Sequence, residues 1–254
     1  MRLKDKVAIV TGGGTGIGMG ISRSLAEAGA RVVIVQSAIE KAEKAANELR
    51  AEGHEIMPYG ADISSREMVQ KLIDTTIEEF GRLDILVNNA AVTGSWAAAP
   101  FLELDDELLE RTIAVNLKGT FIVSQEAARK MTENGGSIIH ISSVGAYAAQ
   151  EGASIYCATK AALLGLTKTM ALELAPYNIR VNAIAPGDIE TETSEKVVDD
   201  IKEQGVSGKY FRRIPLDRRG KPAEIGPTAV FLASDDAAYI TGETIIIDGG
   251  FLIY

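Results

Sequence analysis

The chain has 254 residues, and 35 acidic against 26 basic side chains give it a formal net charge of −9. Such a chain is a poor partner for duplex nucleic acid or an anionic membrane, because both attract clustered lysine and arginine. One cysteine, Cys157, excludes an intrachain disulfide framework, and with two histidines it is too few for a zinc site, so no metal is expected. No apolar leader precedes the first strand-like run and no apolar stretch of about 18 residues follows, which indicates a cytoplasmic protein.

Short apolar runs alternate with helix-length segments along the whole chain. In chain order they predict strand Val7–Val10, helix Gly16–Ala28, strand Arg31–Val35, helix Ile39–Ala51, strand Glu55–Tyr59, helix Arg66–Phe80, strand Leu83–Val87, helix Asp105–Met131, strand Ser137–Ile141, helix Ser154–Leu174, strand Arg180–Ile184, helix Pro222–Leu232 and strand Glu243–Ile247. Strands that are apolar throughout are buried on both faces, which is typical of parallel sheets. The pattern therefore predicts an α/β fold: one Rossmann-like domain, residues 1–254, with a doubly wound parallel sheet of about seven strands and helices on both faces.

One region, Asp188–Lys221, departs from this alternation. It is charged and weakly periodic, where a connection of about two to six residues is usual. Long connections in compact folds are often binding elements, so a substrate lid is predicted near residues 188–221. The alternative is a solvated surface excursion.

The first predicted strand leads into a glycine-rich turn, TGGGTGIG, at residues 11–18. Glycine allows a backbone to approach a ligand closely, and the N-terminus of the following helix offers unpaired N–H groups to a pyrophosphate. Gly12, Gly16 and Gly18 occupy the key positions of a T-G-x-x-x-G-x-G pattern. Tight strand–helix turns need glycine anyway, but the position in the first strand–helix unit favours a dinucleotide site.

The choice between NAD and NADP stays open. An acidic residue after the second strand would accept from the 2′-hydroxyl of NAD and repel the 2′-phosphate of NADP. The chain has Gln36 and Ser37 there instead, and Thr15 in the glycine turn adds no positive charge. The absence of a basic clamp favours NAD slightly, whereas the loss of the acid permits NADP.

A tyrosine and a lysine, Tyr156 and Lys160, are four residues apart on a predicted helix. This spacing places them on one face, about 6 Å apart along the axis. A nearby ammonium favours the phenolate, which would lower the tyrosine pKa and suit acid–base catalysis. The alternative is a surface cation–phenol pair. Ser143 follows a predicted strand at the ligand-binding edge, and Asn116 interrupts an apolar helical run.

TGGGTGIG, the NNAA at residues 88–91, Asn116, Ser143, YCATK at 156–160 and Pro186-Gly187 resemble, in this order and spacing, the short-chain dehydrogenase/reductase family. The resemblance implies an NAD(P)-dependent oxidoreductase that interconverts a ketone and a secondary alcohol by hydride transfer. It implies the catalytic residues Asn116, Ser143, Tyr156 and Lys160. In these roles Tyr156 exchanges a proton with the substrate oxygen and Ser143 holds that oxygen. Lys160 lowers the tyrosine pKa and binds the nicotinamide ribose, and Asn116 holds a water in a proton relay.

The resemblance also implies a set of cofactor contacts. Asp62 is expected at the adenine amino group, Asn89 and Ala90 along the adenosine, and Ile189 and Thr191 near the carboxamide. The full set is Gly12, Thr15, Gly16, Ile17, Gly18, Gln36, Ser37, Asp62, Ile63, Asn89, Ala90, Tyr156, Lys160, Pro186, Gly187, Ile189 and Thr191. Two departures from the family pattern are NNAA in place of NNAG and Gln36 in place of the frequent acid.

The substrate pocket is expected between the segments Thr93–Phe101, Val144–Glu151 and Asp188–Arg213, with Trp96 and Tyr147 as its larger side chains. These alanine-rich walls suggest an open, mostly apolar cavity for a ketone or secondary alcohol, although Trp96 could equally serve loop packing.

An alternative function is 3-oxoacyl-[acyl-carrier-protein] reductase, because near relatives in the family reduce that substrate. An acidic carrier needs a basic docking face, and the turn Met131–Gly136 offers no basic residue. The basic cluster Arg212, Arg213, Arg218, Arg219 and Lys221 is the feature that would support this alternative. A non-catalytic dinucleotide sensor is a third reading, disfavoured by the intact tetrad.

The family resemblance implies a homotetramer that pairs helices Asp105–Met131 and Ser154–Leu174. The apolar tail Phe251–Tyr254 suits a subunit contact, or it closes the subunit's own core. Cys157 and His140 are interpreted as packing residues rather than catalytic groups.

Overall fold

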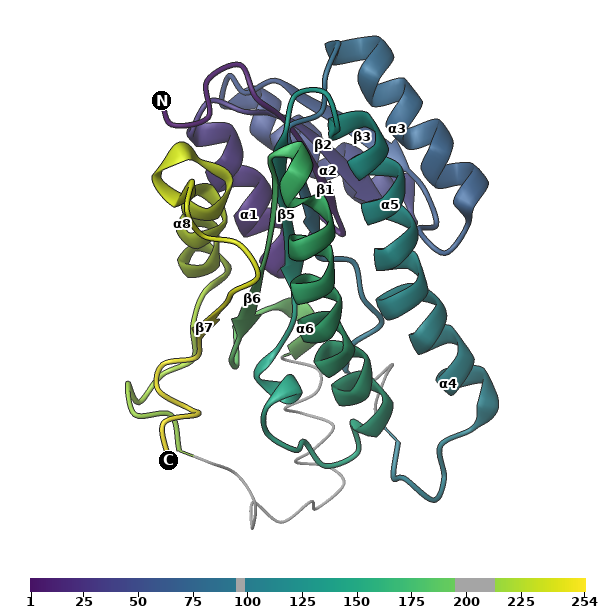
Figure 1. Ribbon diagram of the computed structural model, residues 1–254. Helices are drawn as coiled ribbons and strands as arrows, with labels where there is room; N and C mark the ends of the chain where they lie inside the picture. Colours follow the sequence, from purple (N-terminus) through teal and green to yellow (C-terminus); the bar gives the residue numbers. More distant parts are fainter. Residues whose placement is uncertain (95–98, 195–212) are drawn as a thin grey trace.

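The computed structural model describes residues 1–94, 99–194 and 213–254 (Figure 1). Seven parallel strands form one sheet in the order β3-β2-β1-β4-β5-β6-β7. The order reverses between β1 and β4, which is the switch point of a doubly wound sheet and the usual place for a ligand. The predicted fold class is confirmed.

The strands are β1 (Val7–Thr11), β2 (Arg31–Gln36), β3 (Ile56–Gly60), β4 (Ile85–Asn88), β5 (Gly136–Ile141), β6 (Ile179–Pro186) and β7 (Thr244–Ile247). The helices are α1 (Gly16–Glu27), α2 (Ile39–Ala51), α3 (Arg66–Phe80), α4 (Asp106–Ile113), α5 (Thr120–Met131), α6 (Ser154–Leu174) and α8 (Pro222–Ala233), with short helical segments η2 (Ala114–Gly119), η3 (Val144–Ala146), η4 (Ala175–Tyr177) and η6 (Asp235–Ala237). Each predicted strand and helix corresponds to one of these elements, with one exception described below.

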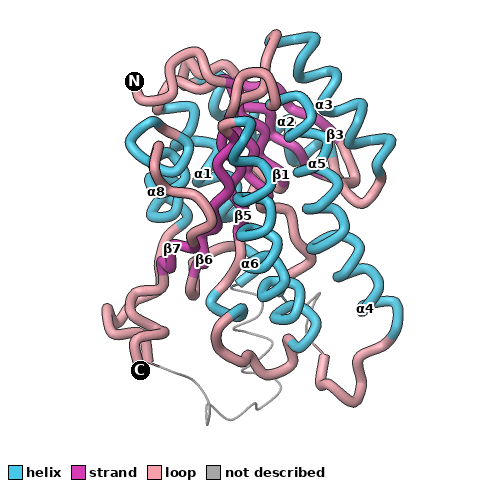
Figure 2. Tube along the Cα trace, in the orientation of Figure 1, coloured by secondary structure: helices cyan, strands magenta, loops and turns pink. Residues whose placement is uncertain are grey.

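The sheet lies between two helical layers, with α1 and α8 on one side and α5 and α6 on the other (Figure 2). All five residues of β1 are buried, and successive side chains point to opposite faces. Val10 therefore packs in the layer of α1, α2 and α8, whereas Ile9 packs in the layer of α3, α5 and α6. Burial on both faces explains why the strands are apolar throughout.

The exception is the region predicted as one helix, Asp105–Met131. The structure divides it into α4, the π-helical segment η2 and α5. A π turn is wider than an α turn and is commonly found at functional sites. The tertiary contact that accompanies the wide turn is made by Asn116, inside η2, and is described with the site.

Candidate active site

The glycine turn between β1 and α1 forms a cradle that larger residues would fill. Gly12 and Gly16 have positive φ angles, +63° and +51°. A Cβ on Gly18 would lie 2.0 Å from the Gly12 carbonyl oxygen, so this position accepts only glycine. The N-cap residue of α1, Thr15, makes no side-chain capping bond, which leaves the first N–H groups of the helix available to an anion.

Asn89 ties the glycine turn to the end of β4. Its Nδ2 donates to the carbonyl oxygens of Thr11 (3.1 Å) and Gly12 (3.0 Å). In return, the Thr11 hydroxyl accepts from the backbone N–H groups of Asn89 and Ala90. The NNAA motif therefore supports the turn that would carry the pyrophosphate.

Gln36, at the end of β2, stands over the same turn. Its Nε2 is buried without a hydrogen-bond partner, and a Cβ on Gly14 would lie 3.0 Å from it. An unpaired buried donor beside a glycine cradle fits a ligand with oxygen acceptors, such as the ribose of a dinucleotide. The residues present thus fit the dinucleotide that the sequence predicts. Ser37, the next residue, is exposed.

The other expected cofactor residues have different environments. Asp62 is oriented by the backbone N–H and hydroxyl of Ser64, at 2.9 and 2.8 Å from its Oδ1. The Ile63 side chain packs into the core, where it blocks any side chain at Gly119, so a cofactor could meet only its backbone. Exposed Thr15 and partly buried Ile17 lie at the start of α1.

The segment after β6 approaches the cradle from the other side. Gly187, which follows Pro186 at the end of β6, bonds through its N–H to the Ile247 carbonyl, at 2.9 Å. Ile189 is buried, and the Thr191 methyl carbon lies 3.1 Å from where a Cβ on Gly16 would be. Thr191 therefore lies directly over the glycine turn.

Lys160 and Tyr156 lie on the face of α6 that meets β5. The Lys160 side chain is buried, with the residue 4% exposed, and its ammonium donates to the Ile141 carbonyl at 2.7 Å. The ammonium lies 5.7 Å from the centre of the Tyr156 ring. Ser142 also binds this part of α6, donating to the Lys160 carbonyl at 2.9 Å. Lys160 is buried and Tyr156 is partly buried, so the two do not form an exposed surface pair.

Burial raises the pKa of Tyr156 above its ordinary value of 10, and hydrogen bonds with the hydroxyls of Ser143 and Thr93 oppose that rise. Burial lowers the pKa of Lys160 to about 8. In the protein alone the pKa of Tyr156 is therefore raised, because burial outweighs the hydrogen bonds that lower it, and the expected lowering by Lys160 stays a prediction.

Asn116 is 1% exposed, and its side-chain amide forms hydrogen bonds with other groups of the protein. Its Oδ1 accepts from the Val92 N–H at 2.7 Å, and its Nδ2 donates to the Val92 carbonyl at 3.1 Å and to the Thr159 hydroxyl at 3.3 Å. The side chain thus holds the backbone just before Thr93. The sequence predicts Thr93 as the first residue of a pocket wall but not as a hydrogen-bond partner of Tyr156, a role that only the structure shows.

Two parts of the expected substrate pocket lie outside the described residues. They are residues 95–98, which include Trp96, and residues 195–212 of the expected lid, which include Arg212. Tyr147 is described and is partly exposed beside η3. Cys157 is partly buried, and desolvation raises the pKa of its thiol, which suits a packing role. Among the residues that the structure describes, no group of three acidic, His or Cys side chains could hold a metal, and no helix is long and apolar enough to cross a membrane.

Comparisons with known proteins agree with this geometry. A family model described as Enoyl-(Acyl carrier protein) reductase matches residues 12–252. The 3-oxoacyl-[acyl-carrier-protein] reductase FabG of Thermotoga maritima is 39% identical over 254 residues, which is 100% of both chains. L-rhamnose 1-dehydrogenase (NAD(P)(+)) of Azotobacter vinelandii is 38% identical over 100% of this chain and 99% of its own. A solved gluconate 5-dehydrogenase from Burkholderia cenocepacia, in complex with NADP and tartrate, is 37% identical, with a TM-score of 0.90 over 100% of this chain and 97% of that one.

The doubly wound sheet and these relatives define the class as NAD(P)-dependent oxidoreductases that act on carbonyl and alcohol groups. Within that class, the chain belongs to the short-chain dehydrogenase/reductase family.

Proposed function

We propose that the protein interconverts a small ketone and a secondary alcohol, with Tyr156 as the general acid and base. The observation that carries this proposal is the set of three hydroxyls, those of Tyr156, Ser143 and Thr93, grouped at the ligand-binding edge of the sheet beside the buried Lys160. When bound, the nicotinamide supplies or accepts the hydride.

In the reductive direction Tyr156 donates a proton to the substrate oxygen as it gains negative charge. A pKa above 10 keeps the phenol protonated at neutral pH, which is the form that this step needs. Ser143 donates a hydrogen bond to the same oxygen. Lys160 holds positive charge beside the Tyr156 ring and would bind the nicotinamide ribose of a bound cofactor.

The test is a panel of ketones, oxidised sugars and secondary alcohols, assayed with both dinucleotides. Turnover of small ketones or sugars, followed by nicotinamide absorbance, is the expected result. A protein that binds neither dinucleotide, or that binds one and turns over no member of the panel, would contradict the proposal.

A second candidate is 3-oxoacyl-[acyl-carrier-protein] reduction, which the relationship to FabG of Thermotoga maritima favours. The charges of the basic cluster argue against it. Arg213, Arg218 and Arg219 each pair with a carboxylate, namely Asp217, Glu224 and Asp188. Among the described members of the cluster, Lys221 therefore belongs to none of these pairs, and Arg212 lies outside the described residues. Reduction of an acetoacetyl carrier protein at a rate comparable with free ketones would reverse this ranking.

NAD is the proposed cofactor, because Gln36 would offer a neutral donor to the adenosine ribose and offers no cation for a 2′-phosphate. We expect Gln36→Arg to shift the ratio of kcat/KM toward NADPH by about tenfold or more, since a guanidinium binds phosphate strongly. A wild-type preference of about a hundredfold for NADPH in kcat/KM would overturn the assignment. Such a ratio would mean that the site favours the 2′-phosphate by about 2.7 kcal/mol.

A homotetramer is the proposed assembly, in a cytoplasmic setting as the sequence predicts. Apolar side chains stay exposed on the helices expected to pair, such as Phe121 on α5 and Leu172 on α6. In the tail, Ile253 is 76% exposed, which supports a subunit contact over closure of the subunit's own core. Light scattering of the protein in solution tests the assembly, and a monomer would contradict it.

A further inference from the structure

The segment Asp188–Ser194 is held in place by one side chain from a distant part of the chain, Arg219. Its Nε donates to Asp188 Oδ1 at 3.0 Å. Its Nη2 donates to the Ile189 carbonyl at 3.1 Å and to the Ser194 hydroxyl at 2.6 Å. The backbone adds a short parallel bridge between Ile189 and Gly220. One planar guanidinium thus contacts three points of a seven-residue segment.

Ser194, which accepts a hydrogen bond from Arg219, is also hydrogen-bonded to Thr191. Its hydroxyl accepts from the Thr191 N–H at 2.8 Å and donates to the Ile189 carbonyl at 2.8 Å, while the Ser194 N–H donates to the Thr191 hydroxyl at 3.1 Å. A hydroxyl has one hydrogen, so the arrangement is satisfied when Arg219 and Thr191 donate and Ser194 passes its own hydrogen on. The Thr191 side chain then stands over Gly16 of the glycine turn.

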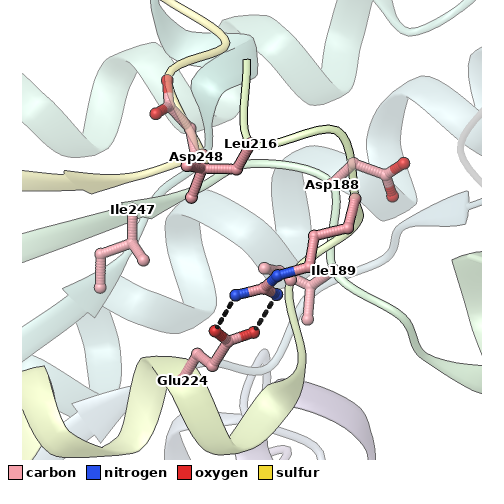
Figure 3. Close-up of a pocket in the computed structure, with 9 residues that line it drawn as sticks. Asp188, Ile189, Leu216, Glu224, Ile247 and Asp248 are labelled. Atoms are coloured by element: carbon pink, nitrogen blue, oxygen red, sulfur yellow. Dashed lines mark hydrogen bonds and ion pairs between the residues drawn. The ribbon is translucent and has the colours of Figure 1, made fainter. Parts of the chain in front are cut away.

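The main chain of Arg219 is itself held against α8. Glu224, in the first turn of α8, receives two hydrogen bonds from Arg218, at 2.8 and 2.6 Å, drawn as dashed lines in Figure 3. The same carboxylate accepts from the Lys221 N–H at 2.8 Å. Arg218 and Glu224 line a cavity of about 90 Å³, together with Ile189, Ile247 and Asp248.

Helix α8 in turn lies directly against α1, the helix that begins at the glycine turn. A Cβ on Gly20 would lie 2.5 Å from the Pro222 carbonyl oxygen, and one on Gly226 would lie 2.0 Å from the Ser24 hydroxyl. A continuous series of contacts therefore leads from the glycine turn through α1 and α8 to Arg219. From Arg219 it continues through Ser194 to Thr191, which again contacts the glycine turn.

We propose that Arg219 is a positioning residue for the dinucleotide: it holds Ile189 and Thr191 beside the glycine turn, where they would meet the nicotinamide half of the cofactor. The inference rests on the proposed function, since it concerns the same cofactor site. Arginine suits this role because a planar fork of donors bridges several acceptors at once, which a lysine ammonium on a flexible stem does not.

The experiment measures the dissociation constant of the preferred dinucleotide by calorimetry for the wild type, Arg219→Ala, Arg219→Lys and Ser194→Ala. We expect about tenfold weaker binding for Arg219→Ala, with an intermediate value for Arg219→Lys, which keeps the charge near Asp188 but loses the bridge. The KM for the dinucleotide rises while kcat at saturation changes little, because Arg219 touches no reacting group. The matched control is Arg213→Ala, because the Arg213 side chain pairs with the exposed Asp217 at 3.2 Å.

A double variant, Arg219→Ala with Ser194→Ala, shows whether the two side chains affect the dissociation constant of the dinucleotide through one network or independently. If both residues act through one network, the double variant binds no more weakly than Arg219→Ala alone. Wild-type affinity in a folded Arg219→Ala protein, with melting behaviour like that of Arg213→Ala, would overturn the inference. Failure of the wild type to bind either dinucleotide would instead overturn the proposed function.

Discussion

Lys160 is buried and Tyr156 is partly buried, and burial shifts the pKa values of the two groups in opposite directions. Desolvation penalises the charged form of each group, so it raises the pKa of the phenol and lowers that of the ammonium. The hydroxyls of Ser143 and Thr93 stabilise the phenolate in part. At neutral pH the protein alone therefore holds a neutral phenol beside a lysine that is mostly protonated.

Removing the Tyr156 hydroxyl isolates its chemical role. We expect Tyr156→Phe to lower kcat by about 10³-fold, because the ring remains while the proton donor is lost. The dissociation constant of the dinucleotide, measured by calorimetry, should stay near the wild-type value. A variant with full turnover would favour a different acid, and a wild type that binds the dinucleotide without turnover would favour the sensor.

The pH profile of reduction tests the state of Lys160. Its ammonium carries charge below a pKa of about 8 and loses that charge as the pH rises through this value. We expect kcat/KM for reduction to fall on the alkaline side of about pH 8, well below the pKa of the tyrosine. Lys160→Arg keeps the charge across this range, so any activity that it retains should lack this limb. A flat wild-type profile to pH 10 would contradict the assignment.

At the scale of single elements, helix α1 is defined by how closely the backbone of its first turn approaches its neighbours. Gly18 lies so near Gly12 and the Asn89 amide that a Cβ would come within 2.5 Å of both groups. The helix start, the end of β1 and the end of β4 therefore form one unit. The π segment η2 is comparable, because Asn116 binds the backbone at Val92 from inside a widened turn.

Two glycines in helices provide a matched comparison. Gly18→Ala should weaken dinucleotide binding by about tenfold or more and destabilise the fold, since the new Cβ would lie 2.0 Å from a carbonyl oxygen. A Cβ on Gly165 of α6 would meet nothing within 4 Å in its own subunit, so Gly165→Ala should leave dinucleotide binding near the wild-type value. Calorimetric binding and chemical unfolding measure both. Equal effects of the two substitutions would refute the close-approach argument.

At the scale of the whole molecule, a buried polar chain crosses the layer of α5 and α6. The Thr167 hydroxyl donates to the Leu163 carbonyl, so it accepts from His140 Nδ1 at 2.9 Å and fixes the neutral tautomer. Ser124 lies 3.4 Å from the other ring nitrogen and accepts from the Asn88 amide at 2.9 Å. His140, on a central strand, thus joins β4, β5, α5 and α6 and is a structural residue.

This histidine predicts how stability depends on pH. Burial, with a smaller effect of Lys160, lowers the pKa of His140 from 6.5 to about 4. Between these values the unfolded chain binds a proton that the folded protein does not, so the free energy of unfolding falls with falling pH, by up to about 3 kcal/mol. Urea unfolding at several pH values measures this slope. His140→Asn should be less stable at pH 7 and show a shallower slope, and an unchanged slope would assign the effect to other groups.

The sequence by itself determined the order of strands and helices, the glycine turn and the tyrosine–lysine spacing on α6, because each depends on residues close together in the chain. The hydrophobic period of a strand or helix, the residue types of a turn and the spacing along a helix each depend on residues a few positions apart. Gly16 in its turn and the pair Tyr156 and Lys160 on α6 are examples.

Only the tertiary structure decided which distant groups meet. The Asn116 amide binds the backbone of Val92, the Gln36 amide is buried unpaired over Gly14, and Arg219 reaches back to Asp188 and Ser194. The direction of the Tyr156 pKa shift belongs here too, since it depends on how much water the packed layers exclude. Partners and desolvation arise from segments far apart in the chain, and no local pattern encodes them.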